Sequence, residues 1–538
     1  MRAKYTDDGV MVQTLHKFCI AFCLALSFVS AYAQDQAEPA AVEPAGPFVI
    51  RSLDFQVQGR TRAFALAQKL EADGPVVGRI FADRAALDSF VADKRQILVN
   101  NRVLASARAH VDFQPNEGGG SDVALLFIVA DTQNLIVLPE PKYDSNTGLT
   151  LYLKGRDYDF FGTMQTLELN LSYVNETVNN RYFEAATDFS LPFRAFDADW
   201  SFGFFEDAGL WTTGTAKSSS AASITYVIPG LGFPARIKAI QGLYYNDDLP
   251  NTTIGQDPLY ESDPWYLSES IAAQAIVPLG ILLGPFGALS LTPKLGLTEN
   301  WWPNTKLLYL NRRGPALAIE GDLNAGRVDW DGNMQRGAVF FASVANTYYA
   351  ASSDTVADLE LKLEGHWAWG RKVGLSARLV ALDRFLGHFP ADDMTDLGVY
   401  LRGVIDARAQ GAAGAFINVS VPVKLFDFPT HVFLRKDWLD FEFQAAPFVD
   451  AAITVPDWSS AASSSRFWGT GGLEFLIFPK AFRSFILRAS VGWDLATVAR
   501  TGSLTALTSD GYKPYEIFIG TDLFTDPILT PRETWIEN

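Results

Sequence analysis

Most of the chain alternates strictly between apolar and polar residues, and this pattern limits the possible folds more than any other feature. In one clear stretch, Leu167, Leu169 and Leu171 alternate with polar residues. The same alternation recurs at 196–204 and 359–364. A period of two places the two kinds of side chain on opposite faces of a β-strand, whereas an amphipathic helix has a period of 3.6. The sequence therefore predicts a long series of amphipathic strands.

Seventeen segments between Thr147 and Phe524 are candidate strands, and we expect 16 of them to form one sheet. We leave out one segment between 300 and 384, because closed bacterial barrels usually have an even number of strands. The candidates are 147–155, 166–173, 180–190, 196–204, 219–229, 234–246, 267–278, 287–299, 313–324, 336–350, 359–364, 371–384, 414–425, 441–453, 466–477, 482–494 and 514–524.

Such a series fits either a soluble propeller or sandwich, or a transmembrane barrel. Many candidates reach the roughly 9–11 residues that a transmembrane strand needs. Aromatic residues make up 13% of the chain, and Trp and Tyr gather at bilayer interfaces. The longest apolar run, 276–291, is broken by Pro and Gly. Because lipid leaves no partner for a bare sheet edge, the sheet must close. We therefore expect a transmembrane β-barrel of about 16 antiparallel strands.

The N-terminus has the organisation of a secretory signal peptide. Lys17 precedes an apolar run at 18–33, and Ala31 and Ala33 supply the small residues of a cleavage site. This run is shorter than the roughly 20 residues that span a bilayer as a helix. We therefore expect residues 1–33 to be an export signal.

Removal of this signal would leave an acidic chain without thiols. Both cysteines, Cys19 and Cys23, lie within it, and the whole chain has a net charge of −17. Met1 and Met11 both remain possible start residues. An acidic, thiol-free, exported chain suits the periplasm or the outer membrane, and the acidic balance argues against a nucleic-acid partner.

Ahead of the strand series, residues 48–131 have the pattern of a small βααββ domain. An Ala-, Glu- and Pro-rich linker, 34–47, separates it from the signal. About 85 residues are enough for an independent domain. The expected elements are a strand at 48–57, a helix at 62–71, a longer helix capped by Asp83, and strands at 105–113 and 122–130.

Motifs of catalysis and metal binding do not occur in the sequence. There is no HExxH, no pair of histidines at metal-ligand spacing and no GxSxG. We expect His110, His366, His388 and His431 to be surface or interface residues rather than ligands. The sequence therefore predicts no enzyme activity, no catalytic residue, no metal and no cofactor.

Three short motifs follow one another within the strand series. The segment 148–162 ends in an aromatic-Gly turn made by Phe160, Phe161 and Gly162. Residues 399–404 read VYLRGV and precede a Pro-bearing strand. Some 30 residues later comes a Phe-x-Asp motif at 448–450.

The order of signal, βααββ domain, barrel and motifs resembles the BamA/TamA superfamily of outer-membrane assembly and translocation proteins. These proteins carry periplasmic POTRA domains followed by a 16-stranded barrel. The resemblance implies a POTRA-like periplasmic domain at 48–131, a barrel at 140–524 and a C-terminal tail at 525–538. It also implies that this outer-membrane protein has a long loop folded back into its lumen.

The resemblance implies that Arg402 and Gly403 form the tip of that loop, and that Phe448 and Asp450 bind this tip on the barrel wall. A guanidinium inside a polar lumen can bind a carboxylate through two parallel hydrogen bonds. Gly beside the Arg allows a tight turn against the wall. Asp406 and Asp437 are competing partners for the Arg.

The sequence also departs from the family pattern. There is room for one POTRA-like domain only, Val404 stands where the family prefers an aromatic residue, and the 525–538 tail follows the last strand. A smaller paralogue or an accessory transporter is therefore as consistent with the sequence as the main insertase.

We expect a barrel that assists the insertion, assembly or translocation of other outer-membrane or secreted proteins. The domain would capture extended segments at its sheet edge. A seam between the first strand, 148–155, and the last, 515–524, would open towards the client. Expected partners are outer-membrane lipids, unfolded barrel or secreted clients, and periplasmic chaperones or accessory lipoproteins. Two alternatives remain: a passive channel or surface structural barrel, and an exporter dedicated to one secreted partner.

Overall fold

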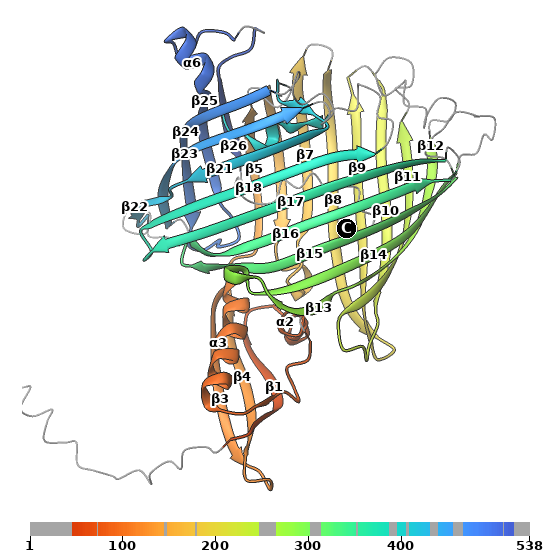
Figure 1. Ribbon diagram of the computed structural model, residues 1–538, viewed down its shortest axis with the longest axis vertical. Helices are drawn as coiled ribbons and strands as arrows, with labels where there is room; N and C mark the ends of the chain where they lie inside the picture. The colour runs from red at the N-terminus through yellow and green to blue at the C-terminus, as the bar shows by residue number, and fades with distance from the viewer. Residues whose placement is uncertain are drawn as a thin grey trace, which may run out of the picture.

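The computed structural model places a small sheet domain at one end of a large barrel (Figure 1). The predicted signal 1–33, nearly all of the linker and the tail 525–538 lie outside the residues that it describes. The described residues are 46–72, 74–144, 148–177, 180–212, 214–246, 265–301, 314–350, 353–386, 395–404, 408–430, 440–455, 466–508 and 511–520.

The N-terminal domain is a four-stranded sheet with two helices. Its sheet order is β2-β1-β4-β3, with β1 parallel to β4 and β3 antiparallel to it. Asp83 caps α3 by accepting a hydrogen bond from the Ala86 N–H at 2.8 Å. A two-residue strand, β2, adds to the expected order. The elements are β1 (Phe48–Gln58), α2 (Ala63–Leu70), β2 (Ile80–Phe81), α3 (Arg84–Asn100), β3 (Leu104–Pro115) and β4 (Ser121–Asp131).

An apolar core lies between this sheet and its helices. Every second residue of β4, including Leu125 and Phe127, is buried, while its other face is partly exposed. Leu66 of α2 and Leu87 of α3 are fully buried in the same cluster. Since a buried Leu or Phe side chain contributes about 1.5–3 kcal/mol, this cluster is sufficient to fix the helices on the sheet.

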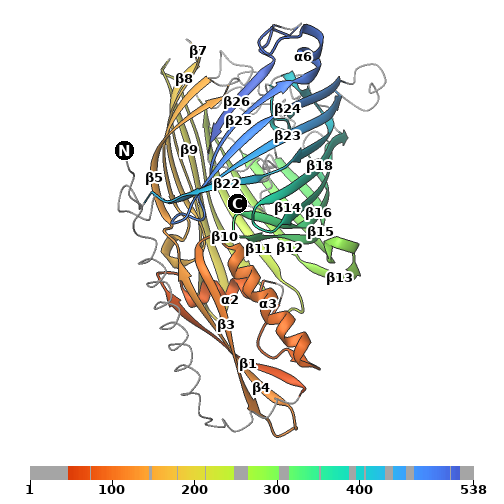
Figure 2. The same cartoon turned by 90° about the vertical axis from the view of Figure 1, so that its left-hand side faces the viewer.

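Most of the remaining described chain forms one closed antiparallel barrel above the domain (Figures 1 and 2). Its strands are β5 (Leu135–Asp144), β6 (Gly148–Asp157), β7 (Leu167–Thr177), β8 (Asn180–Ala195), β9 (Ala198–Trp211), β10 (Ala216–Val227), β11 (Ala235–Asn246), β12 (Trp265–Ala275), β13 (Val277–Leu282), β14 (Ala288–Trp301), β15 (Gly314–Asp331), β16 (Met334–Tyr349), β17 (Asp354–Trp369), β18 (Val373–Leu386), β21 (Ala413–Ser420), β22 (Val423–Phe428), β23 (Phe441–Val455), β24 (Arg466–Pro479), β25 (Leu487–Asp494) and β26 (Tyr515–Gly520).

The barrel class is confirmed, but the expected count of 16 strands is too low. The closed sheet contains 20 strands, of which β12 and β13 both pair with β14, and β21 and β22 both pair with β18 and β23. Counting each interrupted strand once leaves 18 positions around the described barrel. All 17 candidate segments contain a strand, so leaving one out was wrong, and β5 is an additional strand.

The outer surface of the barrel is apolar and its lumen is charged. Leu169, Leu295 and Ile319 point outwards and are each about half exposed. On the opposite face, Lys294 forms ion pairs with Glu320 and Asp322 at 2.9 and 2.8 Å. An apolar exterior around a polar interior is the organisation of a transmembrane barrel. Separately, none of the described helices is both long enough and apolar enough to cross a bilayer.

The strand that begins the barrel is β5 rather than the expected segment 148–155, which forms the second strand. The barrel therefore starts at Leu135, before the expected boundary at 140. Strand β26 pairs with β5 at two register positions, whereas β5 and β6 pair at ten and β25 and β26 at six. The chain beyond Gly520, including Phe524, lies outside the described residues. The β26–β5 pairing is therefore described at these two positions only, next to the end of the described chain.

Candidate functional site: a loop docked in the barrel lumen

The segment that follows β18 folds back against the inner wall of the barrel. It contains a short 3₁₀ turn, Leu397–Tyr400, and a two-strand pairing of Thr395–Asp396 with Gln410–Gly411. Its apolar side chains pack against the lumenal faces of β18, β21 and β23, which supplies an apolar anchor inside an otherwise charged lumen. The buried members of this cluster are Leu397, Tyr400, Leu401, Val404, Ala409, Val380, Phe416 and Ala452.

The structure brings Arg402 and Asp450 together at the loop tip. The Arg402 side chain donates from Nε to Asp450 Oδ2 at 3.0 Å and from Nη2 to Oδ1 at 2.6 Å. The Arg402 backbone N–H also donates to Oδ2, at 3.0 Å. The two side chains are 6% and 0% exposed. Because the pair is two-pronged and shielded from water, it fixes both the position and the orientation of the loop tip.

Phe448 and Gly403 complete this contact. The Arg402 guanidinium lies 3.9 Å above the Phe448 ring, a cation–π geometry. Gly403 has φ +92°, and a Cβ there would lie 2.6 Å from the Gly492 carbonyl carbon. Loop and wall therefore touch backbone to backbone, which only glycine permits at this position.

Sequence reasoning missed several charged residues that also hold the loop. Glu516 of β26 accepts a hydrogen bond from the Gly403 N–H at 2.7 Å. Arg408 forms a second anchor through an ion pair with Asp494 at 3.3 Å, and Asp494 also caps α6 (Leu495–Thr501). Glu474 lies 3.9 Å from Arg402. These partners are separated by up to 113 residues, so no local sequence signal identifies them.

The competing carboxylates Asp406 and Asp437 lie outside the described residues. Two described residues, Arg402 and Arg408, therefore anchor the loop. Their partners lie on β23, β24 and β25, three neighbouring strands of the barrel wall near the seam. Charge, shape and burial at these points suit a loop that stays folded inside the lumen until a contact is broken.

The aromatic-Gly turn lies elsewhere, at the junction between the N-terminal domain and the barrel. Phe160–Gly162 forms a 3₁₀ turn between β6 and β7, and Phe161 is 58% exposed. The Gly162 carbonyl accepts a hydrogen bond from the Arg62 N–H at 2.8 Å. Gly162 has φ +74°, and a Cβ there would lie 2.2 Å from the Arg60 carbonyl oxygen.

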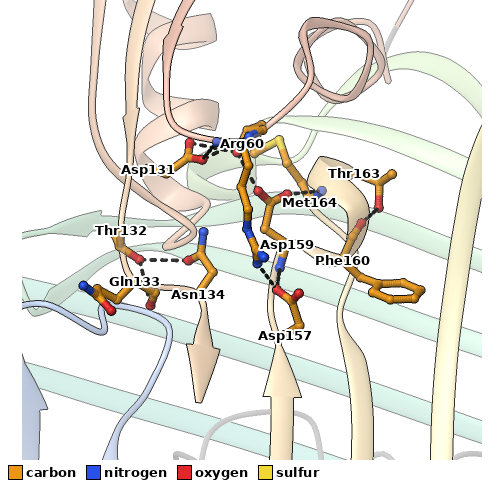
Figure 3. A network of polar contacts seen from close by, with 11 residues as sticks. Arg60, Asp131, Thr132, Gln133, Asn134, Asp157, Asp159, Phe160, Thr163 and Met164 are labelled. Carbon is orange, nitrogen blue, oxygen red and sulfur yellow. Dashed lines mark hydrogen bonds and ion pairs between the residues drawn. The ribbon is translucent and has the colours of Figure 1, made fainter. Parts of the chain in front are cut away.

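A polar network joins domain and barrel beside this turn (Figure 3). Thr61 donates to Asp159 Oδ2 at 2.9 Å, while its backbone N–H donates to Asp131. Arg60 forms an ion pair with Asp157. Burial raises the pKa of the Asp159 carboxyl, although hydrogen bonds from Met164 and Thr61 oppose the shift.

One histidine is placed differently from the expectation of a surface or interface position. His366 of β17 is buried, with Nε2 at 2.5 Å from Glu364 and Nδ1 at 2.8 Å from Ser376. It therefore belongs to the lumenal wall. His110 is exposed, whereas His388 and His431 lie outside the described residues. The described residues contain no group of three or more His, Cys, Asp or Glu side chains placed to hold a metal ion.

Comparisons with known proteins find similarity in structure only. No protein-family model matches the sequence, and no curated protein matches it. CdiB from Acinetobacter baumannii is 13% identical, covers 88% of this chain and 73% of its own, and gives a TM-score of 0.45. BamA from Haemophilus ducreyi lacking POTRA domains 1–3 is 10% identical over 88% and 84%, with a TM-score of 0.39. CdiB from Escherichia coli is 10% identical over 90% and 92%, with a TM-score of 0.37.

Proposed function

We propose that this chain is a BamA/TamA-type outer-membrane barrel that assists the insertion, assembly or translocation of other proteins. The N-terminal domain is its POTRA-like module in the periplasm, and an export signal at 1–33 delivers it there. The sequence motifs already favoured this function, and the contacts of the loop and the seam support it from the geometry of the chain itself.

The observation that carries the proposal is the lumenal loop. A structural barrel has no need of a long segment whose tip is buried and clamped by Arg402 and Asp450. The same tip touches β25 at Gly492 and β26 at Glu516, which are the strands beside the seam. A movement of β26 at the seam would therefore disturb the contacts of the loop tip, and a movement of the loop tip would disturb β26.

The seam supplies the place where a client strand could enter. The described part of β26 pairs with β5 at Phe518–Asp144 and Ile519–Tyr143, where the two ends of the barrel sheet meet. An apolar pocket of about 140 Å³ lies beside this seam, lined by residues that include Ile136, Leu138 and Ile519. A client strand that enters there would pair its own backbone groups, as lipid requires.

The N-terminal domain offers a sheet edge for capture of an extended client. Strand β1 pairs with β2 at Phe48 and Val49 only, and no other described strand lies along that edge from Ser52 to Gln58. Exposed sheet edges bind extended peptides by main-chain hydrogen bonding. This edge therefore provides the first step of client handling.

A disulfide across the seam tests the proposal. The chain from Gln34 onward has no cysteine, so Tyr143→Cys with Ile519→Cys would link β5 to β26 at a register pair. In proteoliposomes with a urea-denatured small outer-membrane barrel as client, the oxidised protein should fail to promote insertion. Reduction should restore the activity.

The matched control is Val491→Cys with Ile517→Cys, which links β25 to β26 away from the seam and should leave activity unchanged. Full activity of the seam-locked protein would exclude opening at this seam. Depletion of the protein in cells that spares every other outer-membrane barrel would favour the passive channel instead.

A further inference from the structure

A row of small residues crosses the outer surface of the barrel on strands β16, β17 and β18. Ala338, Gly365 and Ala377 lie opposite one another at one register level of these strands. Leu359 and Trp367 share the face of β17 that carries Gly365, and they are 41% and 53% exposed. The row therefore belongs to the outer wall, and no side chain larger than a methyl group covers the wall at this level.

Larger apolar side chains border this row on both sides and turn it into a groove. On one side, Phe340, Leu363 and Leu379 form the next outward-facing row of the same strands. On the other side lies the Trp367 ring, which would be 2.7 Å from a Cβ at Gly365. The groove between these borders has a volume of about 520 Å³.

The turn between β13 and β14 closes one end of the groove. This turn is η4 (Gly284–Phe286), a 3₁₀ turn, and its Phe286 ring lies edge to face with the Phe340 ring, with centroids 6.2 Å apart. Pro285 and Phe286 both line the groove. Leu282, at the end of β13, is 78% exposed, and Figure 2 shows β13 at the domain-side edge of the barrel. These exposed apolar residues suit hydrocarbon surroundings, as does the rest of the outer wall.

The charged residues that border the groove belong to the lumen. Glu364, His366 and Arg378 alternate with the outward-facing residues of β17 and β18. Glu364 and His366 bond to each other at 2.5 Å, and their side chains are 6% and 0% exposed. The outward-facing side chains of the groove are therefore apolar, and an apolar ligand fits them.

The groove lies just inside the membrane interface at the domain side of the barrel. Strand β17 ends at Trp369, which is 63% exposed, and Trp367 is exposed two residues earlier. Exposed Trp residues near a strand end are typical of the aromatic girdle at a bilayer interface. Gly365 lies four residues from the strand end, roughly 13 Å along the strand. This is the depth at which the acyl chains of the domain-side leaflet begin.

Two arginines stand at the domain-side edge of the same strands. The side chains of Arg336 on β16 and Arg371 in the β17–β18 turn are 45% and 72% exposed. Arg336 reaches that turn by donating to the Gly370 carbonyl at 3.5 Å. Both guanidinium groups pair with one carboxylate, Asp331, at 3.3 and 2.6 Å, so the three side chains carry a net charge of +1. Since each guanidinium has five N–H donors, the shared carboxylate leaves donors for a phosphate group.

We propose that the groove binds an acyl chain of an anionic glycerophospholipid and that Arg336 and Arg371 bind its phosphate group. An acyl chain is the apolar group that a bilayer presents at this depth, and the net positive charge favours an anionic headgroup. Several strands separate the site from the β26–β5 seam on either side. The site goes beyond the proposed function, which contributes only the identity of this leaflet as the periplasmic one.

Native mass spectrometry tests the site with the full-length protein in detergent and added 1-palmitoyl-2-oleoyl phosphatidylglycerol. We expect one tightly bound lipid, and phosphatidylcholine with the same chains should bind about tenfold more weakly, because it has no net negative charge. Ala377→Phe places a ring in the groove and should abolish this binding, and Ala338→Phe should do the same from β16. Ala381→Phe is the control, because it lies on the same face of β18 outside the groove and should bind as the parent protein does.

A second set of variants tests the headgroup contact. Arg336→Gln combined with Arg371→Gln should lower the affinity for phosphatidylglycerol about tenfold, to that for phosphatidylcholine. Arg194→Gln removes another exposed Arg, at the domain-side end of β8, and should change neither affinity. Heat-modifiable gel mobility shows that each variant barrel is folded. Equal affinity of the parent protein for the two lipids, or unchanged binding in folded Ala377→Phe and Ala338→Phe, would overturn the site. Because no client protein is present, the result is independent of whether the barrel assembles other proteins.

Discussion

In the N-terminal domain, the side chains buried between sheet and helices are largely apolar, whereas many buried side chains of the barrel lumen are charged. Phe127 and Leu66 are fully buried in the domain. In the lumen, Lys294, Arg402 and Asp450 are buried as well. An apolar core needs volume and shape, but a charged interior needs each charge to keep its partner. Different kinds of substitution should therefore destabilise the two regions.

The largest effect is expected from a cavity in the domain. Phe127→Ala should destabilise the domain by about 4 kcal/mol, the usual cost of emptying a Phe site in a packed core. The barrel should persist, because its strands pair with one another and not with β4. Limited proteolysis would report loss of the domain, and heat-modifiable gel mobility would report the barrel.

Ile80→Ala provides the control, since Ile80 is 69% exposed and its loss should cost less than about 0.5 kcal/mol. Loss of heat-modifiable mobility in Phe127→Ala would break the comparison, because it would make barrel stability depend on the apolar core of the domain.

The next effect concerns a charge in the lumen. Asp450→Ala should destabilise the docked loop by about 3 kcal/mol, because it leaves the Arg402 guanidinium buried without its carboxylate. Cleavage by trypsin at the exposed loop, followed by mass spectrometry, would measure the change. Conductance in planar bilayers should rise in parallel.

An exposed ion pair of the domain is the matched control for this loss. Arg84 and Asp88 of α3 are 2.8 Å apart and about half exposed. Asp88→Ala should cost about 0.3 kcal/mol, as for other exposed helical pairs. Similar costs for the two substitutions would show that burial does not strengthen the lumenal pair.

The same contrast explains how far the sequence could predict the fold. Period-two alternation is a local signal, and each of the 17 candidate segments contains a strand. The missed strand β5 contains Pro139 and Pro141, which lack an N–H and argue against a strand interior. Both prolines lie at register positions with β6, so the pairing of the whole barrel overrides this local signal. Because we expected an even number of strands, we discarded one of the 17 candidates. The even number is instead reached by adding β5.

The candidate site was predictable only in part, for a related reason. Arg402 and Asp450 stand out because their motifs occur in a recognisable order along the chain. Glu516 and Arg408 carry no motif, and their partners are 113 and 86 residues away. Closure of the barrel alone brings these residues together. Lumenal partners are therefore set by the register of the whole sheet, which local patterns do not encode.

A smaller effect tests whether shape matters in the charged lumen as it does in the apolar core. Gly492→Ala would place a Cβ 2.8 Å from the Gly403 Cα and 2.9 Å from the Phe448 ring. We expect about 2 kcal/mol of destabilisation of the docked loop, the cost of overpacking a tight contact. Trypsin sensitivity of the loop is again the measurement. Gly469→Ala on β24 is the control, because nothing lies within 4 Å of its Cβ, and it should behave like the parent protein.

The smallest effect lies at the junction, where a buried carboxylate belongs to both regions. Burial raises the pKa of Asp159, so the closed junction binds its proton more tightly than the opened one. The junction should therefore be most stable below the ordinary pKa of Asp and should lose that contribution as the pH rises through the raised value. The Met164 N–H, which donates to Asp159 at 2.8 Å, reports opening by hydrogen exchange corrected for intrinsic rates. Its protection should fall as the pH rises above the ordinary pKa of Asp, and Asp159→Asn should remove this dependence. The same pH dependence in Asp159→Asn would assign the titration to another group, and Asp159 would then contribute to the junction through hydrogen bonds alone.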